Sequence, residues 1–198
     1  LDTRVEYRPA HATTLTKANN GLRSMLKTDG LAVEVFQLLK RAGTIVDKHV
    51  RQRTRALSRM QDIGGCRGIV PSVDQLRAVQ RRLEKNRPPV KVTDYIVNPR
   101  TSGYRAIHVI VSYDDRCIEV QLRTQAMHDW AVAVERLGGR MDEDLKSGRG
   151  PREVLEWLET VSKAMGIEED GKVVDTQLMG RISQLRQQAL PFLSRRHE

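Results

Sequence analysis

The sequence predicts an α+β fold in which one mixed β-sheet is flanked by helices. The middle of the chain contains short segments whose alternation is typical of strands, and both ends carry longer segments with helical spacing. The 198 residues are 39% hydrophobic, which is enough for one domain with a buried core. No run approaches the ~20 apolar residues of a membrane span. We therefore expect a single domain over residues 1–198 and no membrane partner.

The N-terminal third is predicted to be helical. A first helix is expected around residues 14–26 and is broken at Asp29-Gly30. A second is expected over about 31–39, where apolar side chains recur at helical spacing. A third should start at Thr44, because Thr44 and Asp47 have the spacing of a capping box.

The third predicted helix is strongly basic. Between Lys40 and Arg59 there are seven basic residues and one acid, a net charge of +6. The basic residues are Lys40, Arg41, Lys48, Arg51, Arg53, Arg55 and Arg59. Several of them recur at three- and four-residue steps and so share one helix face. This face is either a solvated surface or a groove that holds phosphates.

The remaining elements follow from alternation, spacing and turn residues. In order, they are a strand over 62–70, a helix over 72–85, a strand over 90–97, a hairpin of 104–113 and 116–123, a helix from Thr124 to Gly138-Gly139, and closing helices over 151–165 and 173–190.

The hairpin places several polar residues together. With a tight turn at Asp114-Asp115, His108 lies opposite Gln121, and Glu119 points to the same side. Arg123 is expected on that face as well, because strand side chains alternate. Such a face is either solvated or forms a site.

The net charge indicates the class of binding partner, and the cysteines indicate the cellular compartment. A net charge of +9 favours polyanions such as nucleotides or RNA. Cys66 and Cys117 match no zinc pattern, and we expect them to be reduced in the cytoplasm.

Two carboxylates are candidates for phosphate-transfer chemistry. Magnesium is typically held by one or two protein carboxylates together with substrate oxygens and water. Asp62, at a strand start, and Glu119, on the hairpin, form the obvious pair. The basic helix would supply cations for phosphates.

Four motifs resemble those of RelA/SpoT synthetases. Residues 62–67 (DIGGCR) resemble D-I-x-G-x-R, and residues 119–124 (EVQLRT) resemble E-V-Q-I-R-T. Residues 94–108 resemble D-Y-I…P…N-G-Y-x-S-L-H, and residues 40–48 resemble K-(x)3-S-I-(x)2-K. Together they occur in the family's order over about residues 40–135.

The resemblance implies a nucleotidyltransferase-like sheet and an ATP-dependent pyrophosphokinase. Asp62 and Glu119 would bind Mg²⁺, and Glu119 would also activate the acceptor 3'-hydroxyl. The residues implied for ATP are Lys40, Arg41, Thr44, Lys48, Arg51 and Arg67. Those implied for the acceptor are Arg100, Tyr104, His108, Gln121 and Arg123. The alternatives are that Tyr104 is a core residue of the hairpin and that Arg67 is a salt-bridge partner.

Within this resemblance, two acceptor classes remain open. The stretch 123–135 is more similar to toxins that modify the 3'-CCA end of tRNA, which favours tRNA as acceptor, with Arg55 and Arg59 as candidate RNA contacts. A neutralising antitoxin protein would then be a partner. The alternative is a small alarmone synthetase that uses GDP or GTP, or an adenosine analogue. A rival of another class, a nonenzymatic RNA-binding module, would not need both Asp62 and Glu119.

Overall fold

The computed structural model describes residues 3–28, 30, 34–39, 64–114 and 116–194. The chain divides into two compact units, each described by itself below. The sheet unit contains residues 1–70, 74–93 and 107–122, and the helical unit contains residues 71–73, 94–106 and 123–198. The predicted helix from Thr44 lies outside the described residues. The expectation of one synthetase domain over the whole chain stays a prediction.

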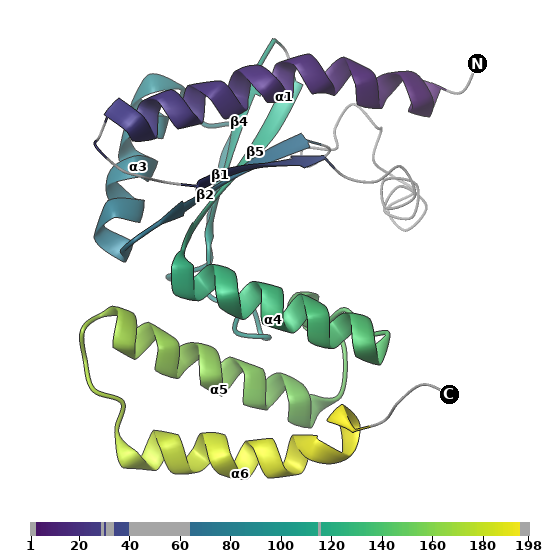
Figure 1. Cartoon of the computed structure of the whole chain (residues 1–198), viewed down its shortest axis with the longest axis vertical. Helices are drawn as coiled ribbons and strands as arrows, with labels where there is room; N and C mark the ends of the chain where they lie inside the picture. The colour runs from purple at the N-terminus through teal and green to yellow at the C-terminus, as the bar shows by residue number, and fades with distance from the viewer. Residues whose placement is uncertain (1–2, 29, 31–33, 40–63, 115, 195–198) are drawn as a thin grey trace. The chain divides into compact units, whose positions relative to one another are not determined.

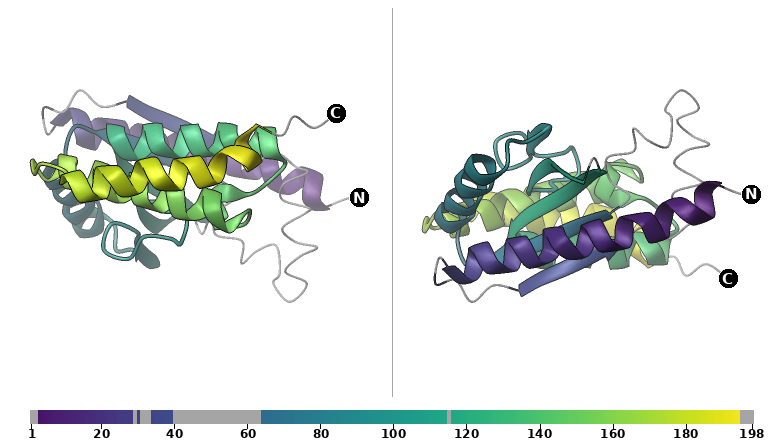
Figure 2. Two further views of the ribbon diagram at one scale, coloured as in Figure 1. Left: turned by 90° about the horizontal axis from the view of Figure 1, so that it is seen from below. Right: turned by 90° about the horizontal axis from the view of Figure 1, so that it is seen from above.

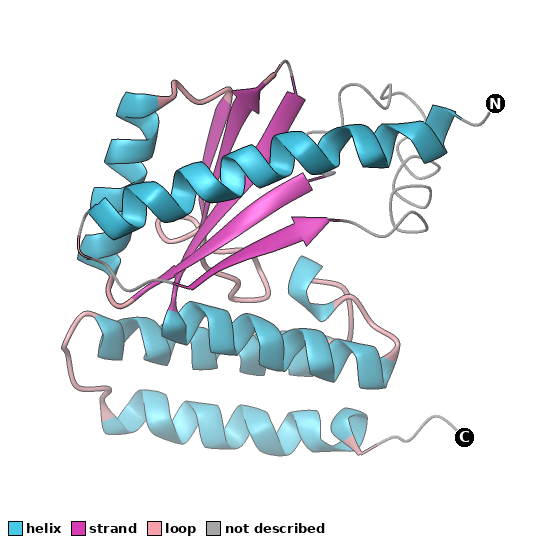
Figure 3. Cartoon of the chain, turned by 45° about the horizontal axis from the view of Figure 1, so that its top comes forward, coloured by secondary structure: helices cyan, strands magenta, loops and turns pink. Residues whose placement is uncertain are grey.

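A five-stranded sheet, magenta in Figure 3, forms the centre of the sheet unit in the order β1-β2-β5-β4-β3. The strands are β1 (Glu34–Leu39), β2 (Gly64–Val70), β3 (Lys91–Asp94), β4 (Ile107–Tyr113) and β5 (Arg116–Thr124). The β1–β2 and β4–β5 pairs are antiparallel. Together with the helices, this sheet confirms the predicted α+β class.

Helix α1 (Thr3–Thr28) packs on β1, β2 and β4 and is longer than predicted (Figure 1). It buries Leu15, Leu22 and Leu26. A Cβ at Gly68 in β2 would lie 3.8 Å from the side chains of both Leu22 and Leu26, so this glycine lies beneath the helix. Helix α3 (Val73–Asn86), ended as predicted before the two prolines, buries one apolar face.

The predicted second helix is wrong, because residues 34–39 form strand β1. Val35 and Phe36 are 6% and 41% exposed, so neighbouring side chains differ in burial as in a half-covered strand. A short apolar run fits either helix or strand by spacing alone. Pairing with β2 decides for the strand, with Val35 opposite Gly68.

The hairpin register is confirmed, with His108 opposite Gln121 and Ile110 opposite Glu119. Asp114 has φ 47°, a left-handed conformation that tight hairpin turns require. The first strand of the hairpin, β4, starts at Ile107 rather than at the predicted Tyr104. Strand β3 is also shorter than predicted, because the Asp94 side chain accepts hydrogen bonds from the backbone N–H groups of residues 96 and 97 and turns the chain.

Helices α4 (Gln125–Met141), α5 (Arg152–Glu169) and α6 (Thr176–Leu193) run side by side in the helical unit (Figures 1 and 2). A short 3-10 helix, η2 (Leu145–Ser147), follows α4. Thr124 caps α4 as predicted, and its side chain accepts a hydrogen bond from the backbone N–H of Met127. No helix among the described residues is both long and apolar enough to span a membrane.

The prediction that Gly138-Gly139 ends α4 is wrong. The helix continues to Met141 and ends at Asp142, which has φ 53°. A Cβ at Gly138 would lie 2.5 Å from the backbone oxygen of Glu143. Gly138 therefore permits a close approach of the returning chain rather than breaking the helix.

Candidate active site

Glu119 is the centre of a hydrogen-bond network that crosses three adjacent strands of the sheet. His108 Nδ1 lies 2.9 Å from Glu119 Oε1, and Gln121 Nε2 donates to Glu119 Oε2 at 2.7 Å. Arg67 Nη2 donates to Gln121 Oε1 at 3.2 Å. We call Arg67, His108, Glu119 and Gln121 the carboxylate network. The structure thus brings together four of the residues predicted from the sequence.

Local packing explains why these side chains converge. The alternate residues of β5 (Ile118, Val120 and Leu122) are at most 2% exposed, so Glu119 and Gln121 point to the other face. A Cβ at Gly65 would lie 2.8 Å from the backbone oxygen of Glu119, so glycine lets β2 lie close to β5. The side chains of His108 and Glu119 are 13% and 18% exposed, which holds the carboxylate firmly and still leaves it accessible.

Glu119 is one of the two carboxylates predicted to bind magnesium, and its surroundings fit that role. Mg²⁺ commonly takes only one or two protein carboxylates. Glu119 supplies one, and the second, Asp62, lies outside the described residues. Among the described residues, no group of three or more His, Cys, Asp or Glu is placed to hold a metal ion. A carboxylate held by two side chains is nevertheless a suitable ligand, since such contacts orient a metal ligand.

Most residues predicted to bind phosphate lie between residues 40 and 59. The ATP residues Lys40, Arg41, Thr44, Lys48 and Arg51, and the candidate RNA contacts Arg55 and Arg59, lie outside the described residues. Their roles stay predictions. Arg67 is described, and its guanidinium donates to Gln121 rather than standing apart from the site.

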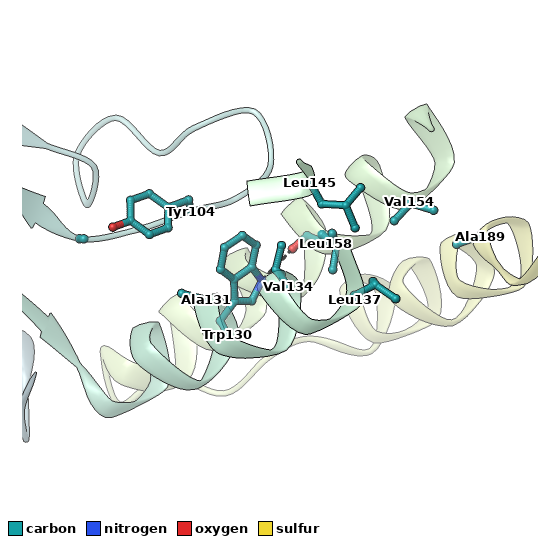
Figure 4. Packing of buried hydrophobic residues seen from close by; sticks show 10 residues of the cluster. Tyr104, Trp130, Ala131, Val134, Leu137, Leu145, Val154, Leu158 and Ala189 are labelled. Carbon is teal, nitrogen blue, oxygen red and sulfur yellow. Dashed lines mark hydrogen bonds between the residues drawn. The ribbon is translucent and has the colours of Figure 1, made fainter. Parts of the chain in front are cut away.

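The predicted acceptor residues Arg100, Tyr104 and Arg123 belong to the helical unit. Arg123 was expected on the exposed polar face of the hairpin, but its side chain is fully buried. Its Nη2 donates to the Tyr104 hydroxyl at 2.8 Å. Tyr104 is 1% exposed and belongs to a buried cluster with Trp130 and Leu158 (Figure 4). Stacking on an acceptor base stays a prediction, and it requires one face of this ring to be uncovered.

Three cations surround the Tyr104 ring. Lys146, Arg123 and Arg100 lie 5.0, 5.1 and 5.5 Å from its centroid. Cations at such distances are attracted to the face of an aromatic ring. Lys146, in η2, was not predicted, because 42 residues separate it from Tyr104 and no local pattern connects the two. Lys146 is also paired with Glu135, at 2.5 Å, and the Arg123 side chain is fully buried.

A family model described as a region found in RelA / SpoT proteins matches residues 38–136, half of the chain. The chain belongs to the RelA/SpoT family. The matched region contains the whole carboxylate network and Tyr104, so it covers the residues on which the sequence resemblance was based.

Two RelA/SpoT relatives are similar in sequence. The chain is 30% identical over 138 residues to GTP pyrophosphokinase YjbM of Bacillus subtilis, which covers 64% of this chain and 63% of that protein. It is 26% identical over 111 residues to the GTP pyrophosphokinase of Escherichia coli K12, which covers 54% of this chain and 15% of that protein. The chain therefore matches less than two thirds of the length of either relative.

The fold is also similar to a solved structure. The crystal structure of small alarmone synthetase 1 from Bacillus subtilis superposes with a TM-score of 0.71, covering 96% of this chain and all of that chain. At 24% identity, this likeness bears on the fold alone.

Proposed function

We propose that this chain is an ATP-dependent pyrophosphokinase that transfers the β,γ-pyrophosphate of ATP to a 3'-hydroxyl. The observation that carries the proposal is the carboxylate network, in which both oxygens of Glu119 are held by neighbouring side chains inside the RelA/SpoT region. The names of the two relatives, both GTP pyrophosphokinases, support the same reaction.

In this reaction, the acceptor 3'-oxygen attacks the β-phosphorus of ATP. A bond from that oxygen to the β-phosphorus forms, the bond from the β-phosphorus to the α,β-bridging oxygen breaks, and AMP leaves. Glu119 would take the proton of the hydroxyl, while His108 and Gln121 hold its carboxylate in one orientation. Magnesium, when held by Asp62 and Glu119, would offset the negative charge of the triphosphate.

A guanosine nucleotide is the acceptor that the relatives support best. GDP or GTP carries a 3'-hydroxyl and a phosphate chain, and Arg100, which is partly exposed beside the Tyr104 ring, would suit those phosphates. The product would then be (p)ppGpp. Either this acceptor or tRNA would place the reaction in the cytoplasm.

The 3'-CCA end of tRNA is the second candidate, because a net charge of +9 favours a partner with many phosphates. The protein would then act as a translation-inhibiting toxin, and an antitoxin protein would be its partner. Charge reversal at Arg55 and Arg59 should weaken tRNA labelling and lower its salt slope by about 1 for each lost phosphate contact. Labelling of GDP in the same preparation should hardly change.

The test is incubation with ATP labelled at the γ-phosphate, with GDP, GTP and deacylated tRNA offered side by side. Glu119→Gln should lower the transfer rate at least ~10²-fold, because it removes the charge that accepts the proton. Glu168→Gln is the matched control, since it makes the same change at an exposed position. Retention of more than about a tenth of the rate in Glu119→Gln would remove Glu119 from the chemistry. If tRNA stays unlabelled while GDP is converted, the toxin hypothesis is wrong.

A further inference from the structure

A largely buried ion pair joins the segment after Tyr104 to the C-terminal end of α5. Arg105 Nη2 contacts Glu169 Oε2, and the two side chains are only 12% and 13% exposed. Burial lowers the pKa of the Arg105 guanidinium below its usual value, against the opposing effect of Asp170. Both residues belong to the helical unit. The pair therefore carries a desolvation cost that a surface pair would not have.

The same carboxylate also holds the segment after Arg123. The Thr124 hydroxyl donates to Glu169 Oε1, while Oε2 faces Arg105. Thr124 is also the N-cap of α4, where its side chain accepts a hydrogen bond from the backbone N–H of Met127 at 3.3 Å. Each oxygen of Glu169 thus contacts a residue that directly follows one of the predicted acceptor residues.

The Tyr104 segment is fixed to α5 at further points. Ser162 Oγ donates to the backbone oxygen of Gly103 at 2.5 Å, and Arg105 Nη1 donates to the backbone oxygen of Ser162 at 3.4 Å. Gly103 has φ +87°, and a Cβ there would lie 2.8 Å from Glu159 Cα. A Cβ at Gly166 would collide with Arg105 Nη1. Small residues therefore let the segment lie directly against α5.

From this geometry we infer that Glu169 is a positioning residue for acceptor binding. Through its contacts with Arg105 and Thr124, it holds the neighbouring side chains of Tyr104 and Arg123 in their relative positions. The inference rests on the proposed function, since it assumes that the acceptor binds against the Tyr104 ring, whose hydroxyl the buried Arg123 holds. This arrangement maintains the hydrogen bond from Arg123 to the Tyr104 hydroxyl, at 2.8 Å.

The test compares Glu169→Gln with Glu168→Gln. The amide keeps the shape of the side chain and an oxygen that can accept from Thr124, but it removes the charge opposite Arg105. The control makes the same change one residue earlier, at Glu168, whose side chain is exposed. We expect Glu169→Gln to raise the KM for the acceptor about tenfold and to leave the KM for ATP and kcat within about threefold. The control should change none of the three.

A second variant covers the case in which Glu169→Gln is unfolded at the assay temperature, as judged by circular dichroism. Arg105→Lys keeps the positive charge but loses the forked geometry, so it should raise the acceptor KM by about threefold, without a change for ATP. An unchanged acceptor KM in the folded variants, or equal changes for acceptor and ATP, would overturn the inference. If the wild-type protein makes no labelled product, the proposed function fails, and the inference fails with it.

Discussion

Gly138 and Gly139 are adjacent in α4, yet alanine should have opposite effects at the two positions. Both lie inside the helix, where replacing glycine by alanine contributes about 1 kcal/mol of helix propensity. Their surroundings differ. A Cβ at Gly139 would meet nothing within 4 Å, whereas a Cβ at Gly138 would lie 2.5 Å from the backbone oxygen of Glu143. We therefore expect Gly139→Ala to stabilise the protein and Gly138→Ala to destabilise it.

The magnitude follows from the contact at Gly138. A carbon–oxygen contact normally lies at about 3.3–3.6 Å, so the Glu143 oxygen would have to move by about 1 Å. That segment resists movement, because Glu143 N donates to Gly138 O at 2.9 Å and the adjacent Asp142 is left-handed. Overpacking of this kind costs about 1–3 kcal/mol. Since the propensity gain is the same at both positions, the two variants should differ in unfolding free energy by about 1–3 kcal/mol.

Thermal and urea unfolding of the two variants, followed by circular dichroism, measure this difference. For a chain of this size, 1 kcal/mol corresponds to about 2–4 °C, so the midpoints should differ by roughly 2–12 °C. Equal midpoints, or a higher midpoint for Gly138→Ala, would show that the loop after α4 yields freely and that the reasoning from the close contact is wrong.

Two further predictions concern buried side chains. Tyr104→Phe removes the hydrogen bond from Arg123 and should lower the free energy of unfolding by about 1.5–3 kcal/mol. Tyr104→Ala should raise the KM for the acceptor far more than the KM for ATP. A change in the KM for ATP alone would contradict the predicted role of Tyr104. A thiol reagent should label Cys117 quickly in the native protein, whereas it should label Cys66 only after unfolding. Burial raises the pKa of Cys66 to about 12, so about one Cys66 side chain in 10⁴ is a thiolate at pH 8. Since an unfolded cysteine has a pKa near 8.5, the contribution of Cys66 to stability is complete below about pH 8.5 and is lost as the pH rises toward about 12. Equal labelling rates for the two thiols would refute the burial of Cys66.

The carboxylate network could be predicted because its contacts follow from local rules. A two-residue turn sets the register of the hairpin, and the period of two along a strand sets the face of each side chain. His108, Glu119 and Gln121 converge for these reasons alone. The same rules failed at β1, because a run of six residues is too short to separate the helical period from the strand period.

The contacts around Tyr104 and Glu169 within the helical unit could not be predicted, because they join residues that are far apart in the sequence. Arg105 and Glu169 are 64 residues apart, and Thr124 and Glu169 are 45 apart. Neither spacing belongs to a motif. Arg123 also departs from expectation for a tertiary reason. The alternation of β5 predicts an exposed face, but the strand runs directly into α4 and its last residues are covered.

Lys146 and Glu169 allow the proposed role of the helical unit in acceptor binding to be tested apart from the transfer chemistry. The region shared with the RelA/SpoT family ends at residue 136, so it contains Glu119 and the residues around it but neither of these two. Lys146 nevertheless lies 5.0 Å from the Tyr104 ring, and Glu169 contacts Arg105 and Thr124. Residues beyond the family region thus complete the surroundings of residues within it. Substitutions in η2 and at the end of α5 should therefore change the acceptor KM and leave the transfer step intact, which Lys146→Gln tests independently of Glu169.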